Sequence, residues 1–129
     1  MELPLTYTLF TPAIVTSPKV CRDFVRSTLE TLGLGDLADT AALCTSELVT
    51  NVHQRVRGEV HLRTTIEEKG VRVAVYDRSP VRPCSQGRVD GDAEGGRGLV
   101  LVEALAHGFG VTKVPDGKGV WFWLAAEGA

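Results

Sequence analysis

The sequence has few of the features that stabilise or anchor a protein other than through a hydrophobic core. It has three cysteines in 129 residues, Cys21, Cys44 and Cys84, and this odd, widely spaced set is a poor disulfide framework. No pair of cysteine and histidine residues has the spacing of a zinc site. Residues 1–10 lack the features of a signal peptide, and no stretch is long enough for a membrane span. We therefore expect a cytoplasmic protein that does not contact membranes.

An excess of charge of one sign is also absent. The 14 lysines and arginines nearly balance 16 acidic residues, which gives a formal net charge of -2. Binding nucleic acid through bulk charge requires a basic surface, so direct nucleic-acid binding is not expected. The hydrophobic fraction of 43% is ordinary for a globular protein. The length fits one domain, residues 1–129, that buries a core without disulfides.

The hydrophobic pattern predicts the order strand, helix, helix, two strands, long loop, helix, two strands. Residues 3–10 alternate as a strand, and Ser17-Pro18 reads as an N-cap and a first helical residue. A second helix is expected from Asp36 to about Arg55. The other expected strands are 60–66, 71–77, 111–114 and 120–124, and the third helix opens at residues 95–98. This order predicts an α+β two-layer sandwich, a mixed sheet with helices on one face.

The second helix has a polar row. Glu47, Asn51 and Arg55 are spaced i, i+4 and i+8, which places them one turn apart on one side. The amide oxygen of Asn51 suits Mg²⁺, which binds few protein ligands together with substrate phosphates and water. The Glu47 carboxylate can orient or deprotonate a hydroxyl. A solvated helix surface would show the same row, so the row alone leaves both interpretations open.

Asp77 ends a valine-rich strand and begins the long loop, a lid that we expect over about residues 78–98. A carboxylate there can accept a hydrogen bond from the exocyclic amino group of adenine. The alternative is that Asp77 only caps the turn at Ser79-Pro80.

The segment Gly95-Gly96-Arg97-Gly98 precedes an apolar helical pattern. A glycine-rich loop that enters a helix presents backbone N–H groups at the positive end of the helix dipole, where phosphate binds. The segment matches neither the P-loop nor the dinucleotide-binding fingerprint. A flexible connection would look the same, so this segment alone is also ambiguous.

Taken in order, four segments resemble the N box and the G boxes of the histidine-kinase-like ATPases. They are Glu47 to Asn51, Asp77 to Pro80, Gly95 to Leu99 and Gly117 to Trp121. The branch most resembled is the small stand-alone anti-sigma-factor serine/threonine kinases and related bacterial regulators of transcription. The resemblance covers nearly the whole chain. It implies a left-handed β-α-β fold of the Bergerat type that binds ATP and Mg²⁺.

The resemblance also implies roles for individual residues. Asn51 would be the magnesium ligand, Glu47 the general base and Asp77 the adenine-recognising carboxylate. The other ATP-binding residues would be Arg55, Gly96, Arg97, Gly98, Leu99 and Lys118. Three positions depart from the family pattern: Val52 replaces an alanine, Arg55 a histidine, and Gly119 a threonine whose hydroxyl would support Asp77.

Three hypotheses for function follow. The first is a kinase that phosphorylates a serine on an antagonist protein and binds a sigma factor, as the resemblance implies. The second is a non-catalytic switch in which nucleotide orders residues 78–95, and the third is a nucleotide-free interaction module. The first helix and the edge strand at residues 3–10 could support a homodimer, as the family suggests. Trp121 and Trp123 share one face of the last strand, and we expect them to pack in the core.

Overall fold

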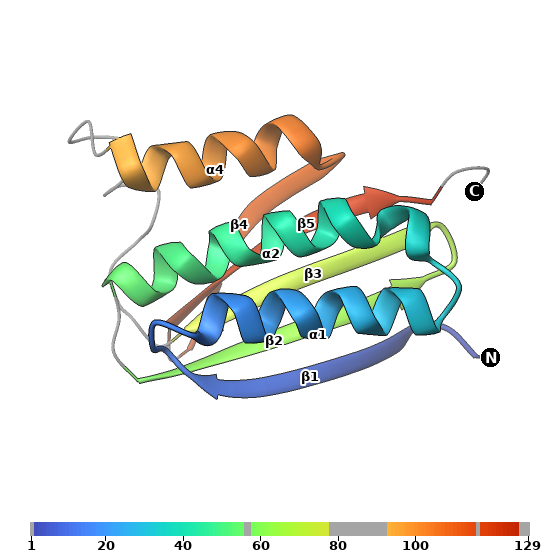
Figure 1. Ribbon diagram of the computed structural model, residues 1–129, viewed down its shortest axis with the longest axis horizontal. Helices are drawn as coiled ribbons and strands as arrows, with labels where there is room; N and C mark the ends of the chain where they lie inside the picture. The colour runs from blue at the N-terminus through green and yellow to red at the C-terminus, as the bar shows by residue number, and fades with distance from the viewer. Residues whose placement is uncertain (1, 56–57, 78–92, 116, 127–129) are drawn as a thin grey trace.

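Strands and helices follow one another in the predicted order in the computed structural model, which describes residues 2–55, 58–77, 93–115 and 117–126 (Figure 1). Side chains of residues 53–55 and 93–98 also lie outside this description. The elements are β1 (Leu5–Pro12), α1 (Ser17–Thr31), α2 (Gly35–Arg55), β2 (Glu59–Glu67), β3 (Gly70–Asp77), α4 (Ala93–Leu105), β4 (Gly108–Val114) and β5 (Gly117–Ala125). The order of elements predicted from the sequence is therefore confirmed for the described residues.

The five strands form one sheet in the order β1-β2-β3-β5-β4. All four neighbouring pairs are antiparallel, so the expectation of a mixed sheet was wrong. The reason lies in the position of β5. Strands β3 and β4 run in the same direction on either side of the segment that contains α4, but β5 is inserted between them. The parallel strands therefore never become neighbours.

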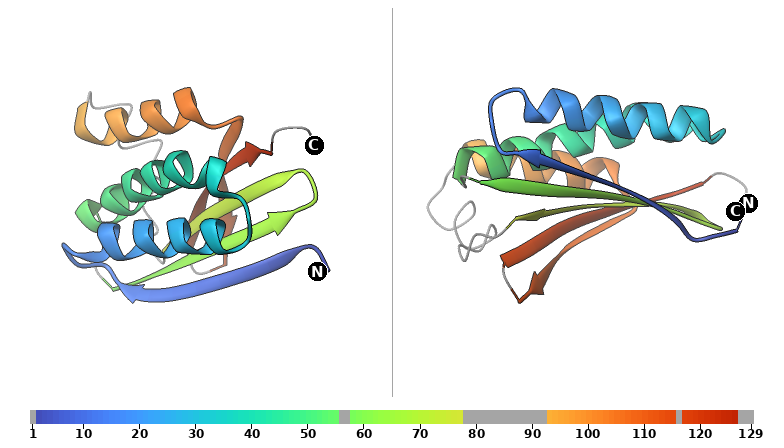
Figure 2. Two further views of the ribbon diagram at one scale, coloured as in Figure 1. Left: turned by 45° about the vertical axis from the view of Figure 1, so that its right-hand side comes forward. Right: turned by 90° about the horizontal axis from the view of Figure 1, so that it is seen from below.

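The described helices lie on one face of the sheet, as predicted (Figure 2). Helix α2 occupies the centre of this layer, because it packs against α1, α4, β3 and β5. The core between the layers combines residues from α1, α2, α4 and the sheet. Its largest fully buried side chains include Val25, Leu29, Leu48, Val49, Leu62, Val73, Val75, Val102, Phe122 and Leu124. The predicted two-layer α+β sandwich is therefore confirmed.

The start of α1 differs from the sequence-based expectation. Ser17 is the first helical residue and not the N-cap, which is Thr16 and makes no side-chain capping bond. The buried Ser17 hydroxyl accepts a hydrogen bond of 3.0 Å from the backbone N–H of Ile14 and donates one to the carbonyl of Pro12. Ser17 thus ties the helix start to the end of β1. Pro18 is consequently the second helical residue, one position later than predicted, and still lies in the first turn.

Trp121 and Trp123 do not pack in the core, so that expectation was wrong. The alternate residues of β5, namely Val120, Phe122 and Leu124, are buried under the helices, whereas both tryptophans point to the other face and are half-buried. Both faces of β5 carry large apolar residues. Alternation along the strand therefore shows which residues share a face but not which face the helices cover.

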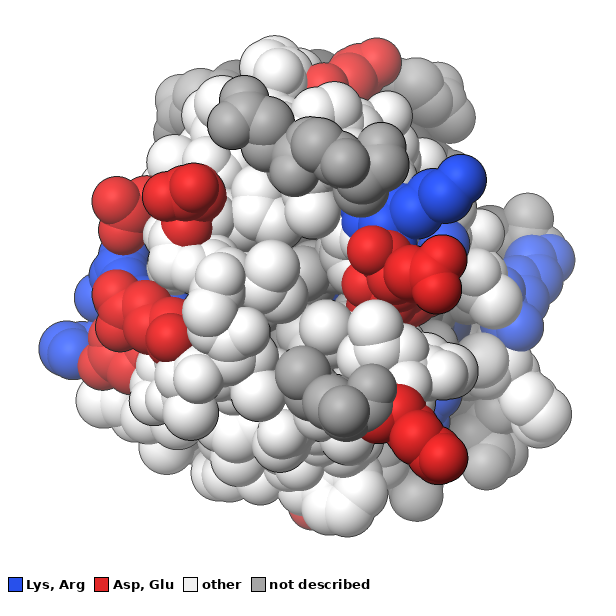
Figure 3. Space-filling view, turned by 90° about the vertical axis from the view of Figure 1, so that its right-hand side faces the viewer, with Lys and Arg blue, Asp and Glu red and all other residues white. Residues whose placement is uncertain are grey.

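Charged side chains are distributed without a dominant sign. On the face drawn in Figure 3, acidic and basic residues are interspersed, as the formal net charge of -2 suggests. None of the helices in the described part of the chain has both the length and the apolar character needed to cross a membrane.

Candidate functional site

Helix α2 presents the polar row that the sequence predicted. The helix is continuous from Gly35 to Arg55, so Glu47 and Asn51 lie one turn apart on the same side. Both are half-buried, whereas Leu48 and Val49 between them are fully buried in the core. The polar pair therefore lies along the border of the core. Arg55 occupies the last helical position, and its side chain lies outside the described residues.

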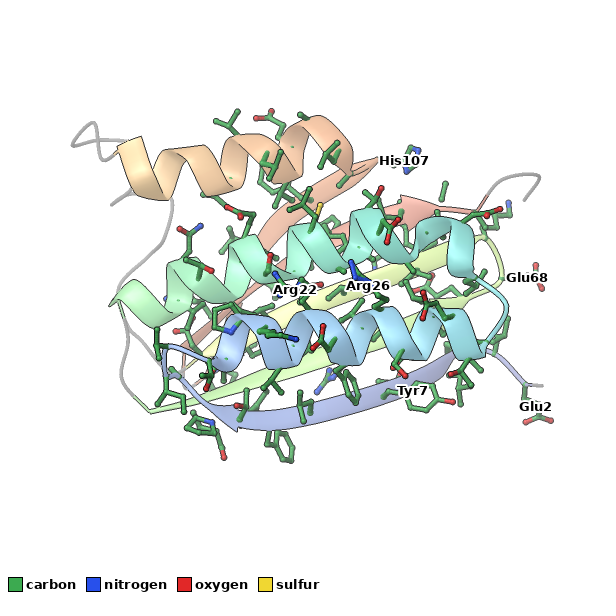
Figure 4. The ribbon with its side chains drawn as sticks, viewed as in Figure 1. Glu2, Tyr7, Arg22, Arg26, Glu68 and His107 are labelled. Carbon is green, nitrogen blue, oxygen red and sulfur yellow. The ribbon has the colours of Figure 1, made fainter. Side chains whose placement is uncertain are left out.

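The position of α2 is set by its neighbours. Besides the shared core, Arg26 of α1 lies 3.5 Å from Asp39 of α2, from Nη2 to Oδ1, and Figure 4 shows Arg26 between the two helices. On its other side α2 packs against α4, and beneath it lie β3 and β5. The elements that carry Glu47, Asn51, Asp77, Lys118 and the glycine segment are therefore all neighbours of α2 or part of it.

Two thiols, Cys21 and Cys44, are buried under the helices. Burial raises the pKa of Cys21 to about 11, and burial followed by the nearby Glu47 carboxylate raises the pKa of Cys44 to about 11. Both thiols therefore remain protonated at neutral pH, and a protonated thiol is neither a nucleophile nor a metal ligand. Both are free cysteines buried in the core, which agrees with the absence of a disulfide framework in the sequence. Cys84 lies outside the described residues.

Asp77 and Lys118 form a buried ion pair at the end of the sheet. The two residues are register partners on β3 and β5, and their side chains point to the helix side, like Val75 and Val120 beside them. Lys118 Nζ donates a hydrogen bond of 2.9 Å to Asp77 Oδ1. The Lys118 side chain is 9% exposed and the Asp77 side chain is 0% exposed. The sequence assigned both residues to one site, and the structure brings them into direct contact.

Tyr76 explains the glycine at position 119. The two residues are register partners on the opposite face from Asp77 and Lys118, and a Cβ at Gly119 would lie 2.5 Å from Cε1 of the Tyr76 ring. Real Cβ atoms do not approach so closely, so threonine does not fit while this ring is in place. Position 119 faces away from Asp77 in this structure, whereas the neighbouring Lys118 donates a hydrogen bond to the Asp77 carboxylate. Sequence reasoning missed Tyr76, and its only signal is an aromatic residue paired with a glycine across two predicted strands.

The glycine segment is part of α4 and does not precede it. The helix begins at Ala93, two residues before Gly95 and earlier than the sequence suggested. Gly95 and Gly96 therefore lie in the first turn of the helix, near the positive end of its dipole. Leu99 is half-buried and packs against the core. The side chain of Arg97 and lid residues 78–92 lie outside the described residues.

Comparison with known proteins agrees with this arrangement. A family model described as the histidine kinase-like ATPase domain matches residues 11–124, from the end of β1 to β5. The chain belongs to the histidine kinase-like ATPase domain family. No curated protein matches the sequence.

As a histidine kinase-like ATPase domain, the chain is an ATP-binding domain. Its residues also fit a nucleotide-bound magnesium ion. The described residues contain no group of three or more His, Cys, Asp or Glu side chains able to hold a metal, but Mg²⁺ bound to ATP does not need one. The half-buried amide of Asn51, next to the Glu47 carboxylate, is a donor set of the kind that completes the coordination of such an ion.

Proposed function

We propose that this ATPase-family domain binds Mg-ATP between α2, the start of α4 and the end of β3, and acts as a regulatory protein serine/threonine kinase. One observation carries the proposal. A half-buried acid–amide pair, Glu47 and Asn51, lies on the helix that also contacts the helix bearing the glycine segment and the strand ending at the buried Asp77.

Each residue has a role that follows from its chemistry. Asn51 provides a neutral oxygen ligand to the magnesium ion, whose charge balances that of the phosphates when it is bound. Asp77 accepts a hydrogen bond from the adenine amino group. Glu47 takes the proton of the acceptor hydroxyl as it attacks the terminal phosphate.

The phosphates meet the start of α4. The backbone N–H groups of Gly95 and Gly96 lie at the positive end of this helix, where they favour an anion. Gly98 lets the chain approach the nucleotide closely, and Arg97 and Arg55 add positive charge. Leu99 and Lys118 complete the proposed pocket.

The partners in this proposal follow from the resemblance to anti-sigma-factor kinases. The acceptor is a serine of an antagonist protein, and the other partner is a sigma factor. Glu47 and Asn51 meet the minimum requirement for phosphoryl transfer, which is positioned Mg-ATP and a base near the acceptor.

The test combines calorimetry with turnover. ATP should bind in the presence of magnesium, and Glu47→Gln should retain that binding while ADP formation falls by roughly 10²- to 10⁴-fold. Glu103→Gln, at an exposed carboxylate of α4, is the matched control and should change neither quantity. Loss of ATP binding in Glu47→Gln would assign Glu47 a structural role and overturn its role as base.

A second candidate function is a non-catalytic nucleotide-dependent switch. The ion pair between Asp77 and Lys118 favours it, because Lys118 already engages one oxygen of the carboxylate proposed to recognise adenine. Binding of adenine at Asp77 would then require the hydrogen bond between Lys118 and Asp77 to rearrange. Equal ADP formation by the wild-type protein and Glu47→Gln, with ATP binding intact in both, would support the switch over the kinase.

A further inference from the structure

Lys118 is the more accessible member of the ion pair at the end of the sheet. Its side chain is 9% exposed, whereas the side chain of Asp77 has no exposed surface. Both side chains point to the side of the sheet that the helices cover, because the two residues are register partners on β5 and β3. A ligand that approaches the Asp77 carboxylate from outside would therefore meet the Lys118 ammonium first.

The Lys118 ammonium has more hydrogen-bond donors than the fold uses. An ammonium carries three N–H groups. One of them donates to Asp77 Oδ1 at 2.9 Å, and the described part of the chain offers Lys118 no second acceptor within hydrogen-bond distance. Buried polar groups in proteins are almost always hydrogen-bonded, so the other donors require an acceptor from water or from a ligand. In the proposed site that ligand is the nucleotide.

The pair presents a different hydrogen-bonding pattern from a carboxylate alone. An ionised carboxylate only accepts hydrogen bonds, and its two oxygens have about four acceptor positions, so Asp77 can serve a ligand as well as Lys118. The ammonium only donates. Because Nζ and Oδ1 are 2.9 Å apart, a donor and an acceptor lie close enough together to contact neighbouring atoms of one ligand.

The Watson–Crick edge of adenine carries the complementary pattern. Its N6 amino group donates, and the adjacent ring nitrogen N1 accepts. Guanine carries the reverse, with O6 accepting and N1–H donating. Since the phosphates are proposed to meet the start of α4, both bases would enter in the same orientation. Guanine would then set O6 against the Asp77 carboxylate and N1–H against the Lys118 ammonium. The carboxylate alone tests one position of the base, whereas the pair tests two.

We propose that Lys118 is a specificity-determining residue of the nucleotide site, which donates a hydrogen bond to N1 of adenine while Asp77 accepts one from the N6 amino group. The hydrogen bond between Lys118 and Asp77 rearranges as the base enters, and the ammonium stays beside the carboxylate. This inference rests on the proposed ATP site, which assigns the adenine amino group to Asp77 but no atom of the nucleotide to Lys118.

Lys113 provides a matched control for Lys118. It is the register partner of Lys118 on β4, so its side chain leaves the sheet on the same side. It is exposed, however, and lies one strand further from Asp77. Lys113 therefore has the charge of Lys118 and a neighbouring position, without the contact to the carboxylate.

The test compares ATP with 1-deaza-ATP, in which a C–H group replaces N1 while the amino group and the triphosphate are retained. Calorimetry with magnesium measures both affinities on the wild-type protein, so the comparison needs no substitution in the chain. We expect 1-deaza-ATP to bind about tenfold more weakly, the loss expected for one charge-assisted hydrogen bond. GTP should bind more weakly still, because both positions of its edge are mismatched.

Variants assign the contact to Lys118. In Lys118→Met, ATP and 1-deaza-ATP should bind with equal affinity, whereas Lys113→Met should retain the difference. Circular dichroism verifies that each variant is folded, and the wild-type comparison is sufficient if Lys118→Met is not.

The outcomes separate this inference from the proposed function. Equal binding of ATP and 1-deaza-ATP by the wild-type protein would overturn the role of Lys118 and leave the ATP site standing. So would a difference that persists in Lys118→Met, because another group would then contact N1, or GTP binding as tight as that of ATP. No binding of ATP by the wild-type protein would overturn the proposed function, and this inference with it.

Discussion

Lys118 and Asp77 meet across β5 and β3 with 2.9 Å between Nζ and Oδ1, and both are almost completely buried. The pair lies at the end of the sheet, where β3 leads toward the proposed nucleotide pocket. It links the last G box to the carboxylate proposed to recognise adenine. Because neither charge faces bulk water, the hydrogen bond between them compensates part of the cost of burying both.

Removing one member of this pair should be costly. Lys118→Met leaves the Asp77 carboxylate buried without its cation, and we expect the free energy of unfolding to fall by about 3–5 kcal/mol in urea denaturation. Combining Lys118→Met with Asp77→Leu should recover much of this loss, because an apolar pair needs no charge compensation. Lys19→Met, which breaks the exposed pair with Asp23, should change the free energy of unfolding far less than Lys118→Met does. Equal costs for both lysine substitutions would contradict the burial of the Asp77 pair.

Restoring the family threonine at position 119 should destabilise this protein. Gly119→Thr places a Cβ against the Tyr76 ring, and we expect a loss of about 1–3 kcal/mol in urea denaturation from overpacking. In a Tyr76→Ala background the same substitution should cost less, because the ring is gone. An unchanged cost in that background would show that the strain has another source.

The role of Asn51 can be separated from general nucleotide affinity. In calorimetry the wild-type protein should bind ATP more tightly with magnesium than with a chelator. Asn51→Ala should bind ATP equally under both conditions, because its oxygen ligand is missing. Asn51→Asp supplies another oxygen ligand and should retain the dependence on magnesium. If Asn51→Ala still responds to magnesium, another residue holds the ion.

The buried thiols predict a loss of stability in alkali. Folding raises the pKa of Cys21 and Cys44 from 9.0 to about 11, so the native state retains protons that the unfolded state releases above pH 9. The unfolded chain then binds fewer protons, and the free energy of unfolding should fall as the pH rises from about 9 to about 11. Urea denaturation at several pH values measures this slope. Cys44→Ala should reduce it, and an identical slope in that variant would contradict the prediction.

The proposed chemistry was largely visible in the sequence. The polar row of Glu47 and Asn51 needs only helical spacing, which local periodicity reveals, and α2 is observed where that periodicity placed it. The position of Asp77 at the end of a strand follows from the valine alternation of residues 71–75 in the same way. These are local properties of the chain. Their combination in one order is what made the family recognisable.

Pairings across the sheet could not be predicted in this way. Nothing near Lys118 in the sequence indicates that it meets Asp77, because that contact depends on the register between β3 and β5. The glycine at position 119 looked like a lost hydroxyl until the Tyr76 ring was seen to occupy the space. The antiparallel sheet likewise depends on β5 entering between β3 and β4, a choice made by the whole fold.

The sequence by itself determined which segments form helices and strands and which residues belong to the proposed ATP site. Each of these depends on periodicity and residue type within a short segment. Only the tertiary structure decided which face of the sheet the helices cover. Val120 and Phe122 alternate with Trp121 and Trp123, so either set could have filled the core. Packing of α2 against β3 and β5 selected the first set and left the tryptophans, with Arg72, on the face opposite the helices.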